Sequence, residues 1–80
     1  MSVEVRLPQW GMGMTDGIVV EWYVQVGDAV EVETPLVAIE TAKLSGDVES
    51  PVKGTVTQVL ADIDDQVDVN EVLLIIDEDE

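Results

Sequence analysis

Few side chains in this sequence could take part in chemistry, and the most informative of them is a lysine. The 80 residues include 18 acidic ones but only three basic ones, Arg6, Lys43 and Lys53, which gives a formal net charge of −15. Histidine is absent, so the commonest general base and the commonest transition-metal ligand are missing. Ser45 and Ser50 consequently have no histidine to activate them. We therefore expect the chain to catalyse no reaction by itself.

The acidic residues between Asp62 and Glu71 are the one cluster that invites comparison with a metal site. A calcium loop of the EF-hand type needs acidic side chains at alternate early positions, glycine at the sixth and glutamate at the twelfth. In a loop starting at Asp62, the fifth, sixth and twelfth positions are Gln66, Val67 and Leu73. The pattern fails, so we interpret these residues as solvated turns and predict no bound metal.

The charge and composition exclude several kinds of partner and location. Nucleic acid and anionic membranes would repel a chain with a charge of −15. No apolar run approaches the roughly 20 residues of a membrane-spanning helix. Residues 1–7 lack the basic start and apolar stretch of a signal peptide. The absence of cysteine fits a cytosolic or organellar matrix setting. We expect a protein of the bacterial or archaeal cytoplasm, without nucleic-acid or membrane partners.

The same stretch of sequence occurs twice, and Lys43 lies between the copies. Residues 17–41 align with residues 54–78 without a gap, at an offset of 37. Two copies are too few for a solenoid. We therefore predict a single all-β domain over residues 1–80 with internal pseudo-twofold symmetry. We also expect a natural N-terminus at Met1 and an acidic tail at 77–80 that starts a linker or frays. The identical pairs are Gly17/Gly54, Val19/Val56, Asp28/Asp65, Val30/Val67, Val32/Val69, Leu36/Leu73 and Ile39/Ile76.

Short runs rich in valine and isoleucine, separated by Gly, Pro, Asp and Asn, are typical of strands. One predicted strand has a conflict of phase, because Ile18, Val20 and Trp22 alternate on one face while the repeat identity falls on Val19. A β-bulge near Val20–Glu21 reconciles the two by turning Val19 and Trp22 inward. The predicted strands are residues 3–7, 17–25, 29–32, 36–41, 45–50, 54–61, 66–69 and 72–77.

Lys43 follows one predicted strand and precedes a segment where the chain can reverse, so we expect it at the tip of a hairpin. A lysine that attacks a substrate needs a lowered pKa, from burial or from neighbouring positive charge. The neighbours of Lys43 in sequence, Glu40, Asp47 and Glu49, offer the opposite environment. Lys43 therefore suits a site at which an outside enzyme attaches a group.

The segment Pro8–Asp16 is glycine-rich and loop-like, yet it contains Trp10, Met12 and Met14. The residues alone leave two interpretations open. Either the loop tucks these apolar side chains into the core, or it exposes them to a partner, since Met and Trp suit adaptable and anchoring contacts.

Together these features resemble the lipoyl domain of the dihydrolipoyl acyltransferases of 2-oxo acid dehydrogenase complexes. The resemblance covers the whole chain and is carried by LPQWGMGMTDGIVVEW, VGDAV, TPL, IETAKL and ESPVKGTV. It implies a flattened β-barrel, a barrel-sandwich hybrid, of two four-stranded antiparallel sheets. It also implies covalent attachment of lipoate to Lys43, with the Pro8–Asp16 loop nearby. The implied partner-recognition residues are Trp10, Met12, Met14, Ala42 and Leu44.

The resemblance further implies a swinging-arm carrier and names its partners. A lipoate ligase or lipoyl transferase would attach the arm. A thiamine-diphosphate dehydrogenase would load it with an acyl group. An acyltransferase core would unload it, and a dihydrolipoamide dehydrogenase would reoxidise it.

Two departures from the family pattern flank the lysine. The family usually has aspartate before it and alanine after it, whereas this chain has Ala42 and Leu44. This choice is closer to the acyltransferases of acetoin-cleaving complexes. The sister biotinyl domains place methionine on both sides. Because this chain has Ala42 and Leu44 at those positions, a biotinyl carrier of a carboxylase is the second interpretation rather than the first. An unmodified β-barrel interaction module is the third.

Overall fold

The structure, a computed structural model, describes residues 1–79, which contain eight short strands joined by turns and loops. Each strand begins and ends within three residues of its predicted range. No helix in residues 1–79 is long and apolar enough to cross a membrane. The strands are β1 (Ser2–Arg6), β2 (Asp16–Trp22), β3 (Ala29–Val30), β4 (Pro35–Glu40), β5 (Ser45–Glu49), β6 (Gly54–Val59), β7 (Gln66–Asp68) and β8 (Val72–Glu78).

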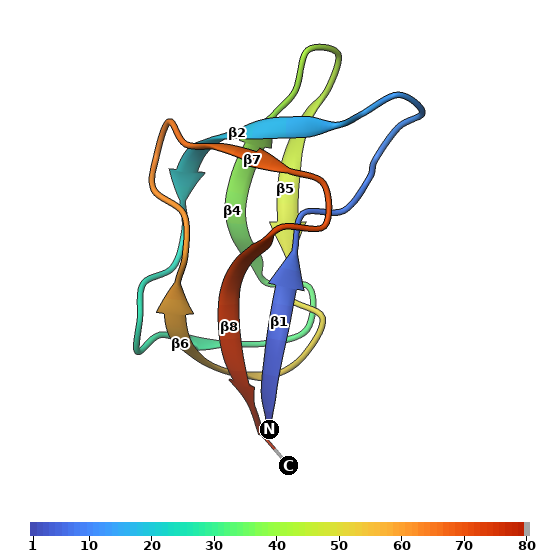
Figure 1. Ribbon diagram of the computed structural model, residues 1–80. Helices are drawn as coiled ribbons and strands as arrows, with labels where there is room; N and C mark the ends of the chain where they lie inside the picture. The colour runs from blue at the N-terminus through green and yellow to red at the C-terminus, as the bar shows by residue number, and fades with distance from the viewer. Residues whose placement is uncertain (80) are drawn as a thin grey trace.

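The strands form two four-stranded antiparallel sheets that pack face to face (Figure 1). One sheet has the order β1-β8-β6-β3 and the other has the order β5-β4-β2-β7. Exchanging β1 with β5, β2 with β6, β3 with β7 and β4 with β8 converts one order into the other. The predicted two-sheet fold and its pseudo-twofold symmetry are therefore confirmed.

Backbone hydrogen bonds at two corners link the sheets, although the ladders do not run continuously around the molecule. At one corner, the Asn70 N–H donates to the carbonyl oxygen of Leu7 at 2.9 Å. At the symmetry-related corner, the Glu33 N–H donates to the carbonyl oxygen of Ser50 at 2.8 Å. The flattening of the barrel thus comes from two packed sheets joined at their corners.

The predicted β-bulge is present, and it occurs twice. The register of β2 against β4 shifts between Val19 and Glu21, and the register of β6 against β8 shifts between Val56 and Gln58. Val19 and Val56 are consequently buried, and Trp22 packs against the core. The bulge therefore resolves the conflict of phase that the sequence showed.

Most of the residues that are identical in both copies lie either in the core or in equivalent turns. Four identical pairs are fully inside, with exposures of 4% or less: Val19/Val56, Val30/Val67, Leu36/Leu73 and Ile39/Ile76. Asp28 and Asp65 each accept a hydrogen bond at 2.9 Å from the backbone N–H three residues earlier, which closes equivalent turns. Val32 is an exception, because it is 59% exposed.

The acidic end of the chain takes part in the sheet further than the sequence indicated. β8 extends to Glu78, so that Asp77 pairs with Ser2 and Glu78 pairs with Gly54. The α-amino group of Met1 also lies 3.2 Å from the carboxylate of Asp77. The structure therefore corrects the expected tail: residues 77–78 belong to a strand, and Glu80 lies outside the described residues.

Gly27 is required by the backbone of its turn rather than by crowding. Its φ is +97°, and a Cβ atom added there would meet no atom within 4 Å. Gly27→Ala is therefore expected to lower the free energy of unfolding by roughly 1–2 kcal/mol, the cost of the left-handed conformation. Gly27→Asn is the control, since asparagine tolerates this conformation. Urea titrations of both variants provide the measurement, and an equal loss in both would contradict the backbone explanation.

Candidate functional site

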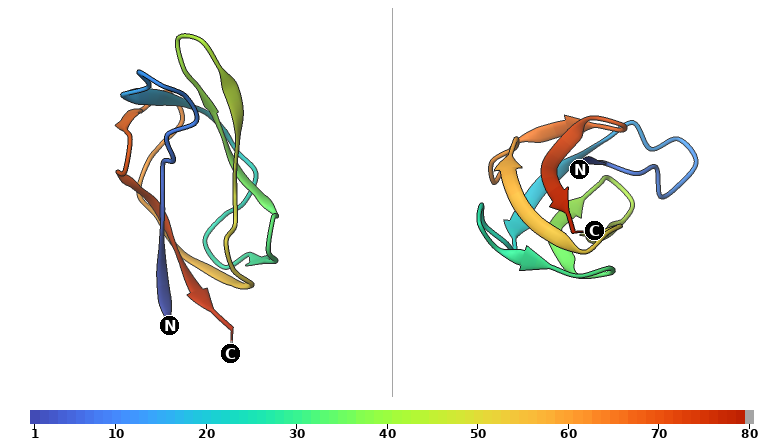
Figure 2. Two further views of the ribbon diagram at one scale, coloured as in Figure 1. Left: turned by 90° about the vertical axis from the view of Figure 1, so that its right-hand side faces the viewer. Right: turned by 90° about the horizontal axis from the view of Figure 1, so that it is seen from below.

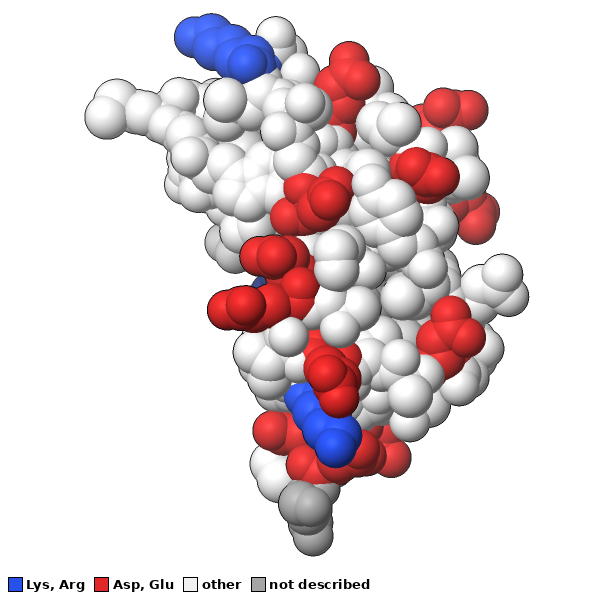
Figure 3. All heavy atoms as spheres, turned by 180° about the vertical axis from the view of Figure 1, so that it is seen from behind, with Lys and Arg blue, Asp and Glu red and all other residues white. Residues whose placement is uncertain are grey.

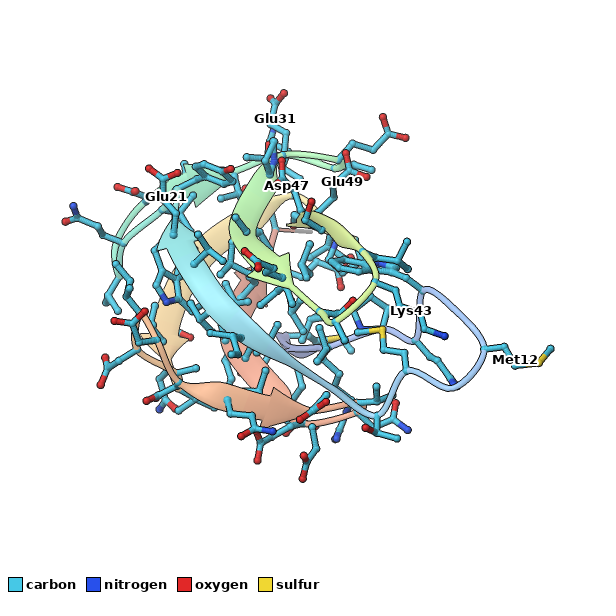
Figure 4. The ribbon with its side chains drawn as sticks, turned by 90° about the horizontal axis from the view of Figure 1, so that it is seen from above. Met12, Glu21, Glu31, Lys43, Asp47 and Glu49 are labelled. Atoms are coloured by element: carbon cyan, nitrogen blue, oxygen red, sulfur yellow. The ribbon has the colours of Figure 1, made fainter. Side chains whose placement is uncertain are left out.

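Lys43 lies at the tip of the hairpin between β4 and β5, as predicted. The ladder between these strands ends at the pair Glu40 and Ser45, and the Thr41 N–H donates to the carbonyl oxygen of Leu44 at 2.7 Å. Residues 41–44 therefore form a tight turn. The side chain of Lys43 projects from this turn and is exposed (Figure 4).

Thr41 fixes the conformation of the turn, a role that the sequence analysis missed. Its Oγ1 accepts a hydrogen bond from the Leu44 N–H at 2.9 Å and a longer one, 3.4 Å, from the Lys43 N–H. The same hydroxyl donates to the Leu44 carbonyl oxygen at 3.0 Å. Threonine at the start of a turn commonly bonds the backbone in this way, and that was the available signal. The turn thus holds the backbone under Lys43 in place.

The lysine hairpin lies at one end of the molecule, and the N-terminus and the end of β8 lie at the other (Figure 1). Their positions are related by the internal symmetry, because the partner of the β4–β5 hairpin is the pair β8 and β1, where the chain begins and the described residues end. A group attached to Lys43 would therefore project away from any chain that continues from these ends.

No charged side chain in the described residues forms an ion pair with Lys43. Within residues 1–79, the ion pairs are Met1 with Asp77 and Arg6 with Glu4, and neither involves Lys43. Acidic side chains are spread widely over the face shown in Figure 3. No group of three or more acidic side chains in the described residues is arranged to hold a metal ion. The site thus offers a free, exposed amine without an adjacent base.

The Pro8–Asp16 loop is anchored at some positions and exposed at others. Trp10 is half-buried and packs against the core, with ring atoms 3.5–3.8 Å from where a Cβ of Gly46 would lie. Met14 also packs against the core, and its sulfur accepts from the Trp10 N–H at 3.3 Å. Met12 is completely exposed, at 101%. The loop therefore satisfies both interpretations, each at different residues.

The loop and the lysine turn lie side by side and enclose a hollow of about 260 Å³, lined by residues 11–16 and 41–44. This hollow brings together Met12, Met14, Ala42, Lys43 and Leu44, all of which the sequence singled out. Trp10 does not line it and supports the β5 side instead. Figure 4 shows Lys43 leaning over the loop, with Met12 pointing outward beyond it.

The loop exists because the two halves of the chain differ there. Ser2 and Val5 of β1 match Ser45 and Val48 of β5 at an offset of 43, whereas the rest of the repeat has an offset of 37. The additional residues of the first half fall in the Pro8–Asp16 loop, whose counterpart is the short connection 50–53. The asymmetry of the chain is thus located beside the lysine.

Comparison with known proteins identifies the family. A family model described as "Biotin-requiring enzyme" (Biotin_lipoyl) matches residues 3–76. The chain belongs to this biotin/lipoyl family. Within the family, its fold matches the solution structure of the lipoyl domain of the 2-oxoglutarate dehydrogenase complex from Azotobacter vinelandii. The TM-score is 0.76 and the identity 26%, over 95% of this chain and 96% of that one.

The similarity to curated proteins is consistent with a lipoyl domain. The chain is 42% identical over 72 residues to the dihydrolipoyllysine-residue acetyltransferase component of the pyruvate dehydrogenase complex from Corynebacterium glutamicum, covering 90% of this chain and 11% of that protein. It is 38% identical over 73 residues to the succinyltransferase component of the 2-oxoglutarate dehydrogenase complex from Bartonella vinsonii subsp. berkhoffii, covering 91% and 18%. This lipoyl domain therefore spans less than a fifth of those bacterial proteins. Lipoyl domains are carrier domains, and such relatives have their catalytic domain elsewhere.

Proposed function

We propose that Lys43 is the residue to which lipoate is attached and that this lipoyl domain carries acyl groups and electrons on that arm. The observation that carries the proposal is the exposed Lys43, which forms no ion pair within residues 1–79, at a hydrogen-bonded hairpin tip opposite the N-terminus and the end of β8. Lys53, the other lysine, follows Pro51-Val52, and its carbonyl oxygen accepts from the Asp79 N–H at 2.9 Å. Lys53 therefore lies at the entry to β6 and not on a hairpin tip.

The residues around Lys43 fit a lipoyl group. Amide formation needs an accessible amine, and no ion pair within residues 1–79 has to be broken to release it. The neighbouring Met12, Ala42 and Leu44 are apolar and exposed, which is compatible with an apolar arm. When bound, the group supplies a dithiolane that accepts an acyl group and two electrons.

The domain itself presents the lipoyl arm to the partner enzymes. The Thr41 hydrogen bonds fix the direction in which the arm leaves the turn. The N-terminus and the end of β8 lie at the opposite end of the molecule, so a tether attached there would leave the arm facing the partner. Tethering raises the effective concentration of the arm at each partner's active site without requiring tight binding.

The proposed partners are those of a 2-oxo acid or acetoin dehydrogenase complex. They are a lipoate ligase or lipoyl transferase, a thiamine-diphosphate dehydrogenase, an acyltransferase core and a dihydrolipoamide dehydrogenase. The names of the relatives support membership of such a complex, and their bacterial sources support a location in the cytoplasm. Partner recognition is assigned to Met12, Ala42 and Leu44 at the surface, with Trp10 and Met14 holding the loop in position.

Intact mass after incubation with lipoate, ATP and a lipoate ligase tests the proposal. A gain of one lipoyl group is expected, and the matched incubation with biotin and a biotin ligase should give no gain. A biotin adduct on the unaltered chain would favour the biotinyl carrier, and no adduct in either incubation of folded protein would favour the unmodified interaction module.

Met12 and Trp10 are expected to respond differently to truncation. Met12→Ala should leave the denaturation midpoint unchanged and slow reductive acylation by the dehydrogenase, because exposed anchors contribute strongly at interfaces. Trp10→Ala should lower the free energy of unfolding by about 3 kcal/mol, since its ring packs on Gly46 and the core. Comparing denaturation midpoints with acylation rates separates the two roles. An unchanged acylation rate in Met12→Ala would remove Met12 from the recognition surface.

A further inference from the structure

β1 and β5 are edge strands that face each other across a groove. Each strand is the first of its sheet and pairs on one side only, β1 with β8 and β5 with β4. No Cα atom of β1 lies within 8 Å of a Cα atom of β5. A hollow of about 330 Å³ lies between them, lined by residues 4–6 of β1, by residues 47–49 of β5 and by Pro8, Trp10 and Pro51 from the adjoining loops. In the left-hand view of Figure 2, β1 and β5 lie on the same side of the molecule, one from each sheet.

The walls of this groove contain backbone groups that are free to form a ladder. In an antiparallel pair, alternate residues bond to the neighbouring strand, and those between them face away from it. The Glu78 N–H donates to the Met1 carbonyl oxygen, and the Thr41 N–H donates to that of Leu44. Counting from these pairs, the backbone groups of Glu4 and Asp47 face the groove, and neither residue forms a backbone hydrogen bond across it.

The two edge strands lie too far apart to pair with each other, which leaves space for an extended chain between them. Neighbouring strands in a sheet lie about 4.8 Å apart, so a strand inserted between two edges needs them roughly 10 Å apart. The separation of more than 8 Å between Cα atoms allows this, whereas it is too wide for β1 and β5 to pair directly. The floor is already closed, because Val5 and Val48 are each only 4% exposed. An occupant would therefore pair along the edges without opening the core.

We propose that this groove binds one extended segment of a basic protein partner, which adds as a strand between β1 and β5. The site is separate from Lys43 and its hollow, with which it shares no lining residue. Main-chain hydrogen bonds to Glu4 and Asp47 would supply the ladder, as in other cases of strand addition.

The acidic side chains along the edges of the groove favour a basic segment as its occupant. Glu4, Asp47 and Glu49 are exposed along the groove, and Figure 4 shows Asp47 and Glu49 together on β5. Arg6, the basic residue of the lining, is held by Glu4 at 3.0 Å and by the Asn70 carbonyl oxygen at 2.8 Å, so Asp47 and Glu49 carry the net negative charge of the groove's rim. Charged edges protect strands from pairing with copies of themselves. With a net charge of −15, a second copy of this chain is repelled, whereas a lysine- or arginine-rich segment is attracted.

Titration of the nitrogen-15-labelled domain with a short peptide that alternates lysine and valine tests the proposal by NMR. The Glu4 and Asp47 amides should shift and exchange more slowly with solvent, whereas the Val5 and Val48 amides, which face the neighbouring strands, should change little. A peptide of the same charge with proline in place of valine loses the N–H donor at every second residue, and with it the ladder to one of the two edges. It should bind about tenfold more weakly.

Charge reversal provides the matched comparison. Asp47→Lys with Glu49→Lys should transfer the preference to a peptide that alternates glutamate and valine. Glu21→Lys with Asp62→Lys changes the net charge equally outside the groove lining and should retain the preference for lysine. Equal affinity for the proline peptide, shifts confined to other surfaces, or no binding of the lysine peptide would each overturn the proposal.

Discussion

Lys43→Arg is expected to abolish lipoate attachment, and with it acyl transfer, while leaving the fold unchanged. A guanidinium remains protonated and cannot form the amide, although it keeps the positive charge of the lysine. The side chain is exposed and forms no ion pair within the described residues, so its loss should change stability by no more than roughly 0.5 kcal/mol. Intact mass, reductive acylation and thermal unfolding of the same sample measure the three quantities.

Lys53→Arg is the matched control, since it makes the same change at the other lysine. It should be lipoylated and acylated like the unaltered domain. If Lys43→Arg were still lipoylated, the proposed attachment site would be wrong. If it lost much of its thermal stability, Lys43 would have a structural role that its exposure does not indicate.

Gly54→Ala is expected to lower the free energy of unfolding by about 3 kcal/mol, as overpacking against an immovable neighbour does. A Cβ atom at Gly54 would collide with the backbone carbonyl of Asp77 and lie 2.9 Å from Cγ2 of Ile76. Asp77 cannot move away, because β8 is paired with β1 on one side and with β6 on the other. Small domains have total stabilities of about 5–15 kcal/mol, so much of the stability would be lost.

Gly46→Ala tests whether this effect is specific to the crowded position. The nearest atoms to a Cβ at Gly46 belong to the Trp10 ring at 3.5 Å, which is ordinary contact. This variant should therefore unfold at nearly the same urea concentration as the unaltered domain. Equal midpoints for Gly54→Ala and Gly46→Ala would show that β6 and β8 separate more easily than their pairing indicates.

The strands and the core could be predicted because apolar residues alternate along the strands and recur at the same positions in the two copies. The conflict of phase around Val19 even predicted the β-bulge, since only a bulge satisfies both the alternation and the repeat. The burial of Val30/Val67 and Leu36/Leu73 follows from the same repeat. Such features are local, so a short window of sequence contains enough information.

The features that the sequence did not reveal depend on contacts between distant segments. Trp10 packs on Gly46, which is far from it along the chain, and no local pattern indicates such a contact. The groove between β1 and β5 arises from the spacing of two edges in different sheets. The acidic residues 77–80 looked like a tail because of their charge, but pairing with Ser2 and Gly54 holds Asp77 and Glu78 in β8. Tertiary pairing overrode composition in that case.

Tryptic mapping of the lipoylated domain tests the central claim most directly. The chain has cleavage sites only after Arg6, Lys43 and Lys53, and trypsin does not cleave after an acylated lysine. Attachment at Lys43 should produce the peptide 7–53 with one lipoyl group, whose fragmentation places the group on Lys43. Attachment at Lys53 would instead leave peptide 7–43 free and produce a lipoylated peptide 44–80, which would contradict the account.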